Sequence, residues 1–157
     1  MKKIPAVFAL IVVLALAAQS QPDYSAFLPD SQLTPGATFN VTANDVCTAG
    51  YAGRVRNVPQ SEKNAVYAEY HIDHRQPGEY EVDHLISLEL GGSNDIKNLW
   101  PQSYVTKPLN AHVKDKLENA LHREVCSGKV DLATAQHDIA TNWITSYQKY
   151  VGDLPTN

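Results

Sequence analysis

Residues 80–102, YEVDHLISLELGGSNDIKNLWPQ, restrict the possible folds of this chain more than any other segment. From Tyr80 to His84, non-acidic and acidic residues alternate, which is the period of a half-buried β-strand. A Gly-Gly-Ser-Asn loop follows at 91–94, and NLWP at 98–101 predicts a short returning strand that ends at its proline. We therefore expect an antiparallel pair of strands, with an Asp-His pair at the end of the first strand.

Helices are expected on both sides of this pair of strands, over residues 61–72, 109–128 and 131–152. In the second of these ranges, apolar residues recur every four positions from Val113 to Val125, and the third range carries a broad apolar stripe. The order helix, strand, strand, helix, helix predicts a small α+β domain.

The N-terminus has the pattern of a secretory signal peptide over residues 1–20. Two lysines precede an apolar run from Ile4 to Ala18, and small residues follow where a signal peptidase would cut. The run is shorter than a comfortable membrane span. We expect a secreted or periplasmic protein that is free of the membrane once the signal peptide is removed.

The rest of the chain is expected to form one domain of residues 46–152, with a short tail of residues 153–157. Its length is that of a single domain with its own core, and we expect it to be a monomer. Residues 21–45 are rich in Pro, Ser, Thr, Gln and Asn and show no sustained period. They predict an extended or disordered arm up to about residue 46.

The chain has two cysteines, Cys47 and Cys126. In an exported protein an isolated pair is most simply a disulfide, and two buried free thiols are the alternative. In the chain-entropy model, closing a loop of this length would stabilise the fold by about 4–5 kcal/mol. Two cysteines cannot form a four-thiolate zinc site.

The net charge argues against nucleic-acid binding by charge alone. The full chain has 13 basic and 17 acidic residues, and loss of Lys2 and Lys3 with the signal peptide leaves 11 and 17, a net charge of −6. A polyanionic partner would have to be held locally or through a metal ion.

Asp83 and His84 are the strongest candidates for chemistry. A neutral imidazole can take a proton from water near pH 7, and a neighbouring carboxylate can hold a divalent cation. A hydrogen-bonded, purely structural histidine is the alternative. Because adjacent strand residues point to opposite faces, both side chains can serve one site only if the strand bends or ends there.

EVDHLISLELGGSNDIKNLWPQ followed by a helix resembles the ββα-metal motif of HNH endonucleases, in which Asp-His ends the first strand and an asparagine follows. Here Asn98 comes 14 residues after His84. The chain is also similar to a small exported HNH-like family over roughly residues 47–150, in LGGSN, IKNLWPQ, a KD-LE helix and a VC-G end. The resemblance implies a ββα-metal motif with flanking helices.

The resemblance also implies residue roles. His84 would be the general base that activates water, and Asn98 would hold the His84 loop in register. Asp83 would bind one divalent metal ion, Mg²⁺ in the first place, with Mn²⁺, Ca²⁺ or Zn²⁺ as alternatives.

The ligand expected from the following helix departs from the family pattern, because Lys107 stands at the usual position. Asn110, His112 and Asp115 are the nearest candidates, and His112 is favoured because imidazole is a sound metal ligand. Lys114 is a candidate for a phosphate contact.

These expectations together describe a metal-dependent endonuclease that hydrolyses phosphodiester bonds of DNA, RNA or both with little sequence specificity. A non-catalytic extracytoplasmic binding or structural module on the same scaffold is the alternative. A toxin nuclease is a third reading, although the chain leaves little room for a delivery domain.

Overall fold

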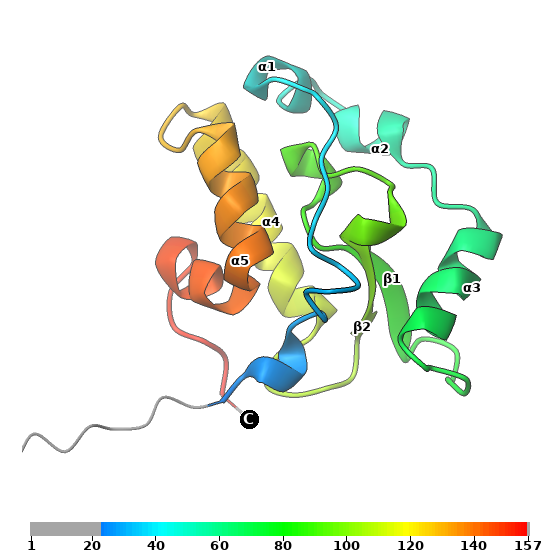
Figure 1. The fold of residues 1–157 in the computed structure, drawn as a ribbon. Coiled ribbons are helices and arrows are strands. Elements are labelled where there is room, and N and C mark those ends of the chain that lie inside the picture. Colours follow the sequence, from blue (N-terminus) through cyan, green and yellow to red (C-terminus); the bar gives the residue numbers. More distant parts are fainter. Residues whose placement is uncertain (1–22, 157) are drawn as a thin grey trace, which may run out of the picture.

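The structure, a computed structural model, describes residues 23–156, so the expected signal peptide lies outside the described residues. The described chain forms a small single α+β domain of five helices and a two-stranded sheet, as the predicted order of helices and strands implies (Figure 1). In chain order the elements are α1 (Ala43–Val46), α2 (Tyr51–Val55), α3 (Gln60–Glu69), β1 (Tyr80–His84), β2 (Leu99–Ser103), α4 (Ala111–Cys126) and α5 (Leu132–Tyr150). Three short 3₁₀ turns are η1 (Ser25–Phe27), η2 (Leu88–Leu90) and η3 (Ile96–Asn98).

The two strands are antiparallel, with His84 opposite Leu99 and Asp83 opposite Trp100. Directly opposed residues share a face of a sheet, and residues two apart along a strand do too. Asp83 and Glu81 therefore lie on the same face as Trp100 and Gln102. The side chain of Asp83 contacts α4, so this is the face towards that helix.

The returning strand does not end at Pro101 as the sequence suggests, but continues through it to Ser103. In a two-stranded sheet both strands are edge strands, and an edge strand tolerates a residue without a backbone N–H group. The sheet is therefore longer than expected, and it carries Gln102 into the protein interior.

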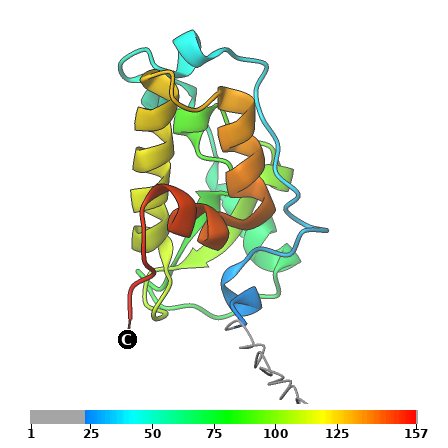
Figure 2. The same ribbon diagram turned by 90° about the vertical axis from the view of Figure 1, so that its left-hand side faces the viewer.

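Helices α4 and α5 pack side by side and supply most of the core. Leu117, Leu121 and Ile139 are fully buried, as the apolar periodicity predicts. Within α5, Asn142 leaves helical geometry, and its Oδ1 accepts hydrogen bonds from the backbone N–H groups of the next turn. Figure 2 shows the change of direction in the last part of α5.

Residues 23–42 run in largely extended form between α5 and the loop that joins β1 to β2 (Figure 1). Thr38 forms an isolated bridge with Gly92, and the indole Nε1 of Trp143 donates to the carbonyl of Phe27 at 2.9 Å. The segment expected to be extended or disordered is thus extended and hydrogen-bonded to the rest of the domain from Phe27 onward. It belongs to the folded domain because its backbone finds partners that local periodicity does not reveal.

The predicted disulfide is confirmed, since Cys47 and Cys126 are bonded with their Cα atoms 5.6 Å apart. It joins the end of α1 to the end of α4. Such bonds are typical of oxidising compartments outside the cytosol. Across residues 23–156, no helix combines the length and the apolar character that a membrane crossing requires.

Gly92 is the tightest point of the β1–β2 loop, because a Cβ atom there would lie 1.7 Å from the carbonyl oxygen of Ile86. We expect Gly92→Ala to lower the free energy of unfolding by about 1–3 kcal/mol, since that oxygen belongs to fixed backbone. Urea denaturation measures the change. Gly53→Ala in α2, with no neighbouring atom within 4 Å of the added Cβ, should leave stability unchanged or slightly higher. If both variants were equally stable, the β1–β2 loop would be able to move away from the added Cβ at position 92, contrary to this expectation.

Candidate functional site

The site begins with His84, at the point where β1 ends and the chain turns into the β1–β2 loop. Its side chain is buried, with only 2 % of the residue exposed. The next residue, Leu85, donates its backbone N–H to the carbonyl of Asn98 at 2.8 Å. The two ends of the loop therefore meet directly beside His84.

Asn94 fixes the tautomer of the His84 ring. The amide Nδ2 of Asn94 donates to the carbonyl of Val55 at 2.8 Å, so its Oδ1 is the atom that faces His84 Nε2, 3.1 Å away. This oxygen can only accept, and in the neutral ring Nε2 must therefore carry the proton. Nδ1 keeps its lone pair, and no group within residues 23–156 hydrogen-bonds to it.

Burial lowers the pKa of His84 below its ordinary value, although the Asn94 hydrogen bond and the charge of Asp83 oppose the change. The ordinary value is about 6.5. At neutral pH the ring is therefore uncharged and able to accept a proton at Nδ1.

Asn98 closes the loop with its side chain, which is fully buried. Its Nδ2 donates to the carbonyls of Ile86 and Ser93 at 3.0 and 2.9 Å, and its Oδ1 accepts from the N–H of Ile86 at 2.9 Å. These bonds hold both arms of the loop together, so Asn98 has the bracing position suggested by its spacing from His84.

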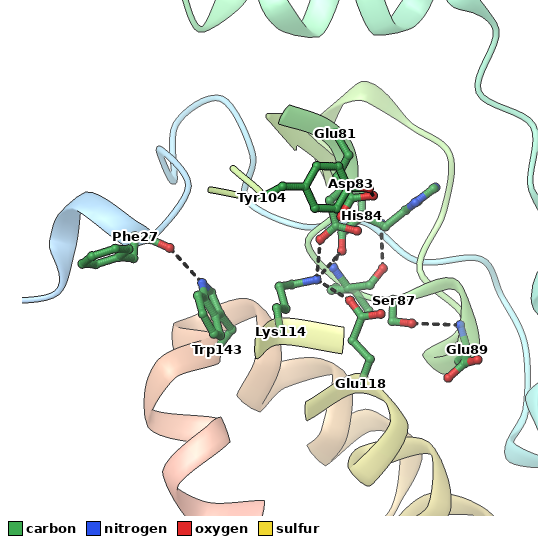
Figure 3. Close-up of polar contacts among 12 residues, drawn as sticks. Phe27, Glu81, Asp83, His84, Ser87, Glu89, Tyr104, Lys114, Glu118 and Trp143 are labelled. Carbon is green, nitrogen blue, oxygen red and sulfur yellow. Dashed lines mark hydrogen bonds and ion pairs between the residues drawn. The ribbon is translucent and has the colours of Figure 1, made fainter. Parts of the chain in front are cut away.

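Lys114 lies inside the protein, and not at the surface as a phosphate contact would require. It has no exposed area, and its Nζ donates to Asp83 Oδ2 at 2.7 Å, to the backbone carbonyl of His84 at 2.8 Å and to Glu118 (Figure 3). All three ammonium protons are thus engaged within the fold. The reason is helical geometry, because Lys114 shares the core-facing side of α4 with Leu117 and Leu121.

Two carboxylates, those of Asp83 and Glu118, contact this single ammonium, and its charge also acts on the carboxyl groups of Glu81 and Asp115. Burial alone would lower the pKa of Lys114, but the charges of Asp83 and Glu118 outweigh burial and raise it. Burial raises the pKa of Glu118 to about 7, although Lys114 opposes the rise. Lys114 therefore stays charged, and Glu118 is the partner that takes up a proton.

Two further carboxyl groups have raised pKa values, mainly because they are buried. Burial raises the pKa of Glu81. The hydroxyl of Tyr104, which donates to Glu81 Oε2 at 2.6 Å, partly opposes this rise. Burial and then the charge of Asp83 raise the pKa of Asp115. One ammonium does not neutralise the group, and an additional cation would be favoured there.

The three helix residues considered as metal ligands form no hydrogen bond or ion pair with Asp83. Asn110 caps α4: its Oδ1 accepts from the N–H of Val113, and its Nδ2 donates to the carbonyl of Thr106, both at 3.2 Å. The His112 side chain is 68 % exposed, and its Nδ1 lies 3.7 Å from Asp115 Oδ2. Lys114, and none of these residues, makes the contact from α4 to Asp83.

A separate group of potential ligand atoms comprises Cys47, His122 and Cys126, all within 4.8 Å of one another. Its two sulfur atoms are joined in the disulfide, and thiolates are the form in which cysteine binds metal. The Nε2 atom of His122 also lies 3.1 Å from the carbonyl oxygen of Val46. With the disulfide intact, this group is a structural junction.

Sequence reasoning missed Asn94 and Glu118 as members of the site. Asn94 stands in the Gly-Gly-Ser-Asn loop, so an amide able to reach the preceding histidine was visible as a signal. Glu118 follows Lys114 by four residues, but that spacing is also typical of surface ion pairs. No protein-family model, curated protein or solved structure matches the chain. A functional proposal therefore rests mainly on the site itself: the neutral His84 ring, the loop held by Asn98 and the carboxylates that Lys114 only partly compensates.

Proposed function

We propose that this protein is an exported HNH-type endonuclease that hydrolyses phosphodiester bonds of nucleic acid with little sequence specificity. The observation that carries the proposal is the His84 ring, which is neutral near pH 7 and has Nδ1 free to accept a proton. It lies beside Asp83 at the end of β1, as the resemblance to HNH endonucleases implies.

In the proposed reaction, His84 Nδ1 takes a proton from water while the water oxygen attacks phosphorus and the bond to the leaving oxygen breaks. The ring becomes an imidazolium whose Nε2–H still donates to Asn94, and the adjacent Asp83 carboxylate favours its charge. Asn98 keeps the loop closed, so that the base is held in position.

The carboxylates fit one divalent cation, with Asp83 as the residue that would hold it. Their oxygen atoms suit Mg²⁺, and Mn²⁺, Ca²⁺ or Zn²⁺ are alternatives. Burial is the main cause of the raised pKa values of Glu81 and Asp115, and the charge of Asp83 adds to both shifts, which supports a cation beside Asp83. When bound, such a cation supplies positive charge that stabilises the phosphate. Asn110 or His112 could join only by giving up part of its present contacts.

The rate of cleavage is expected to rise with pH and to reach a plateau near neutrality. A base acts in its deprotonated form, and burial lowers the pKa of His84, so the midpoint should lie below about 6.5. Initial rates of plasmid nicking between pH 4.5 and 8.5 measure it. A rate that is flat over this range would exclude His84 as the base.

The proposal is tested with purified, disulfide-bonded protein, supercoiled plasmid and single-stranded RNA, at low salt and with each divalent cation in turn. We expect nicking or cleavage that a chelator abolishes and that Mg²⁺ restores. Because the protein is acidic and cannot bind the polyanion by charge alone, the rate should depend only weakly on added salt. Absence of cleavage of either nucleic acid under every cation would overturn the proposal.

A non-catalytic extracytoplasmic module is the second candidate, and the Lys114 ion pair is the observation that favours it. The Lys114 ammonium, 2.7 Å from Asp83 Oδ2, already compensates the negative charge of Asp83. A protein that binds no cation would need such compensation. Thermal melting during a Mg²⁺ titration distinguishes the two. A catalytic cation site should raise Tm with concentration, and a module that binds no cation should not.

A further inference from the structure

Away from His84, the sheet face that carries Asp83 borders a cavity of about 140 Å³. It lies between β2, η1, the start of α4 and α5. Its floor is buried and largely apolar or aromatic, whereas Ala26 and Thr106 at its edge are exposed. The lining residues that matter are Phe27, Trp100, Gln102, Leu109, Asn110 and Trp143.

Two side chains on this floor have buried polar atoms without partners. Among residues 23–156, neither Nε2 nor Oε1 of Gln102, 3 % exposed, has a hydrogen-bond partner, and neither does Nε1 of Trp100, 5 % exposed. Such groups are rare in folded proteins because their desolvation is not offset. The other indole is different, since Trp143 Nε1 donates to the carbonyl of Phe27 (Figure 3).

Trp100 and Gln102 point to the same side of β2, because they are two residues apart on one strand. That side is the one that contacts α4, whose first turn and preceding loop line the cavity. Both residues line the cavity, but their unpaired polar atoms have almost no exposed surface, so an occupant would have to move these side chains to pair with them.

We propose that the cavity binds a nucleobase. The Gln102 amide presents one donor and one acceptor side by side, which is the pattern that glutamine uses to pair with the edge of a base. The indoles of Trp100 and Trp143 and the ring of Phe27 provide aromatic walls of the kind on which bases stack. The unpaired Trp100 Nε1 offers one further donor.

The size of the cavity selects a single ring system. Pockets for drug-sized molecules are about 300–1,000 Å³, so about 140 Å³ suits one heterocycle, with sugar and phosphate left at the exposed edge. Gln102 stands three residues beyond Leu99, the partner of His84. At about 3.4 Å per residue, this places Gln102 roughly 10 Å along β2 from the level of His84.

Leu99 and Gln102 are an odd number of residues apart, so the cavity lies on the other face of the strands from His84, and its occupant would be a base away from the cleaved phosphate. The assignment rests on the proposed nuclease function. The cavity would then position the substrate strand through one type of base at a distance from the cleaved bond. Binding to the cavity is nevertheless measurable without any cleavage.

The experiment is a fluorescence titration of the full protein, because both of its tryptophans line the cavity. Adenosine, guanosine, cytidine, uridine and thymidine are added in turn, with ribose 5-phosphate as the control and with correction for absorbance. We expect saturable quenching by at least one nucleoside and none by ribose 5-phosphate. Absence of saturable quenching by every nucleoside would overturn the proposal.

Gln102→Met keeps the length of the side chain and removes both polar atoms. It is expected to lower the affinity for the nucleoside that binds by about 10- to 100-fold. Its Tm without ligand should be equal to or above that of the wild type. Gln148→Met, at an exposed position of α5, should change neither quantity. A lower Tm in Gln102→Met with unchanged nucleoside affinity would show that the amide is satisfied inside the protein, and the proposal would be wrong.

The outcome separates this proposal from the nuclease proposal. Nucleoside binding that depends on Gln102, in a protein that cleaves no nucleic acid, would retain the cavity and reject the reaction. Cleavage by His84 in a protein without nucleoside binding would retain the reaction and reject the cavity.

Discussion

Replacing Lys114 by methionine is expected to lower the free energy of unfolding by about 3–5 kcal/mol, the usual cost of removing one partner from a buried ion pair. The Lys114 ammonium has no exposed area, and the side chains of Asp83 and Glu118 are only 16 % and 15 % exposed. Methionine would fill most of the space but would leave two facing carboxylates without a cation. The backbone carbonyl of His84 would also lose its donor from α4.

The loss of unfolding free energy in Lys114→Met should increase as the pH rises. Burial already raises the pKa of Glu118 to about 7, and loss of Lys114 removes the charge that opposes this rise. A carboxyl group whose pKa is raised on folding favours the folded state while it is protonated, and this stability is lost as pH rises through the folded pKa. The variant should therefore be closest to the wild type near pH 5 and furthest from it near pH 8.

Urea denaturation at both pH values measures these differences, with Lys116→Met as the matched control. Lys116 lies on the exposed side of the same helix, so its replacement should change stability by no more than about 0.5 kcal/mol. If Lys114→Met were as stable as Lys116→Met at pH 8, the buried charge group would contribute nothing to the fold.

The elements with a clear period could be predicted from the sequence, and the elements defined by tertiary partners could not. The alternation before His84 identifies β1, and the apolar repeat from Val113 to Val125 identifies α4, because both patterns reflect burial on one side of an element. Residues 23–42 lack such a pattern. They are held by individual bonds, such as that between the Phe27 carbonyl and the indole of Trp143.

The same distinction applies to the candidate site. Spacing along one loop identifies His84 and Asn98, because both ends of that loop are close in sequence. The environment of Lys114 depends on the rotation of α4 against β1, which a charged residue in a mixed helix does not reveal. Its pairing with Glu118 resembles a surface pair in the sequence and is a buried one in the structure.

His84→Ala is expected to reduce the rate of nucleic-acid cleavage by about 10²- to 10⁴-fold, the usual contribution of a positioned general base. The loss should be in the rate of the chemical step at saturating protein, because His84 is buried and offers almost no surface to a substrate. His137→Ala, at an exposed position of α5, is the matched control and should retain full activity.

Removal of a buried ring also leaves a space and an unpaired Asn94, so the folding of the variant must be measured separately. Far-ultraviolet circular dichroism and Tm establish that it is folded at the assay temperature. Added imidazole provides a second control. It can restore proton transfer in a folded variant that lacks only the base, and it cannot restore activity to an unfolded one.

The most direct measurement is therefore the single-turnover rate of plasmid nicking by the wild type, His84→Ala and His137→Ala at pH 7.5, with and without imidazole. The account predicts full activity in the wild type and in His137→Ala, a loss of about 10²-fold or more in His84→Ala, and partial recovery with imidazole. Undiminished nicking by a folded His84→Ala variant would contradict it.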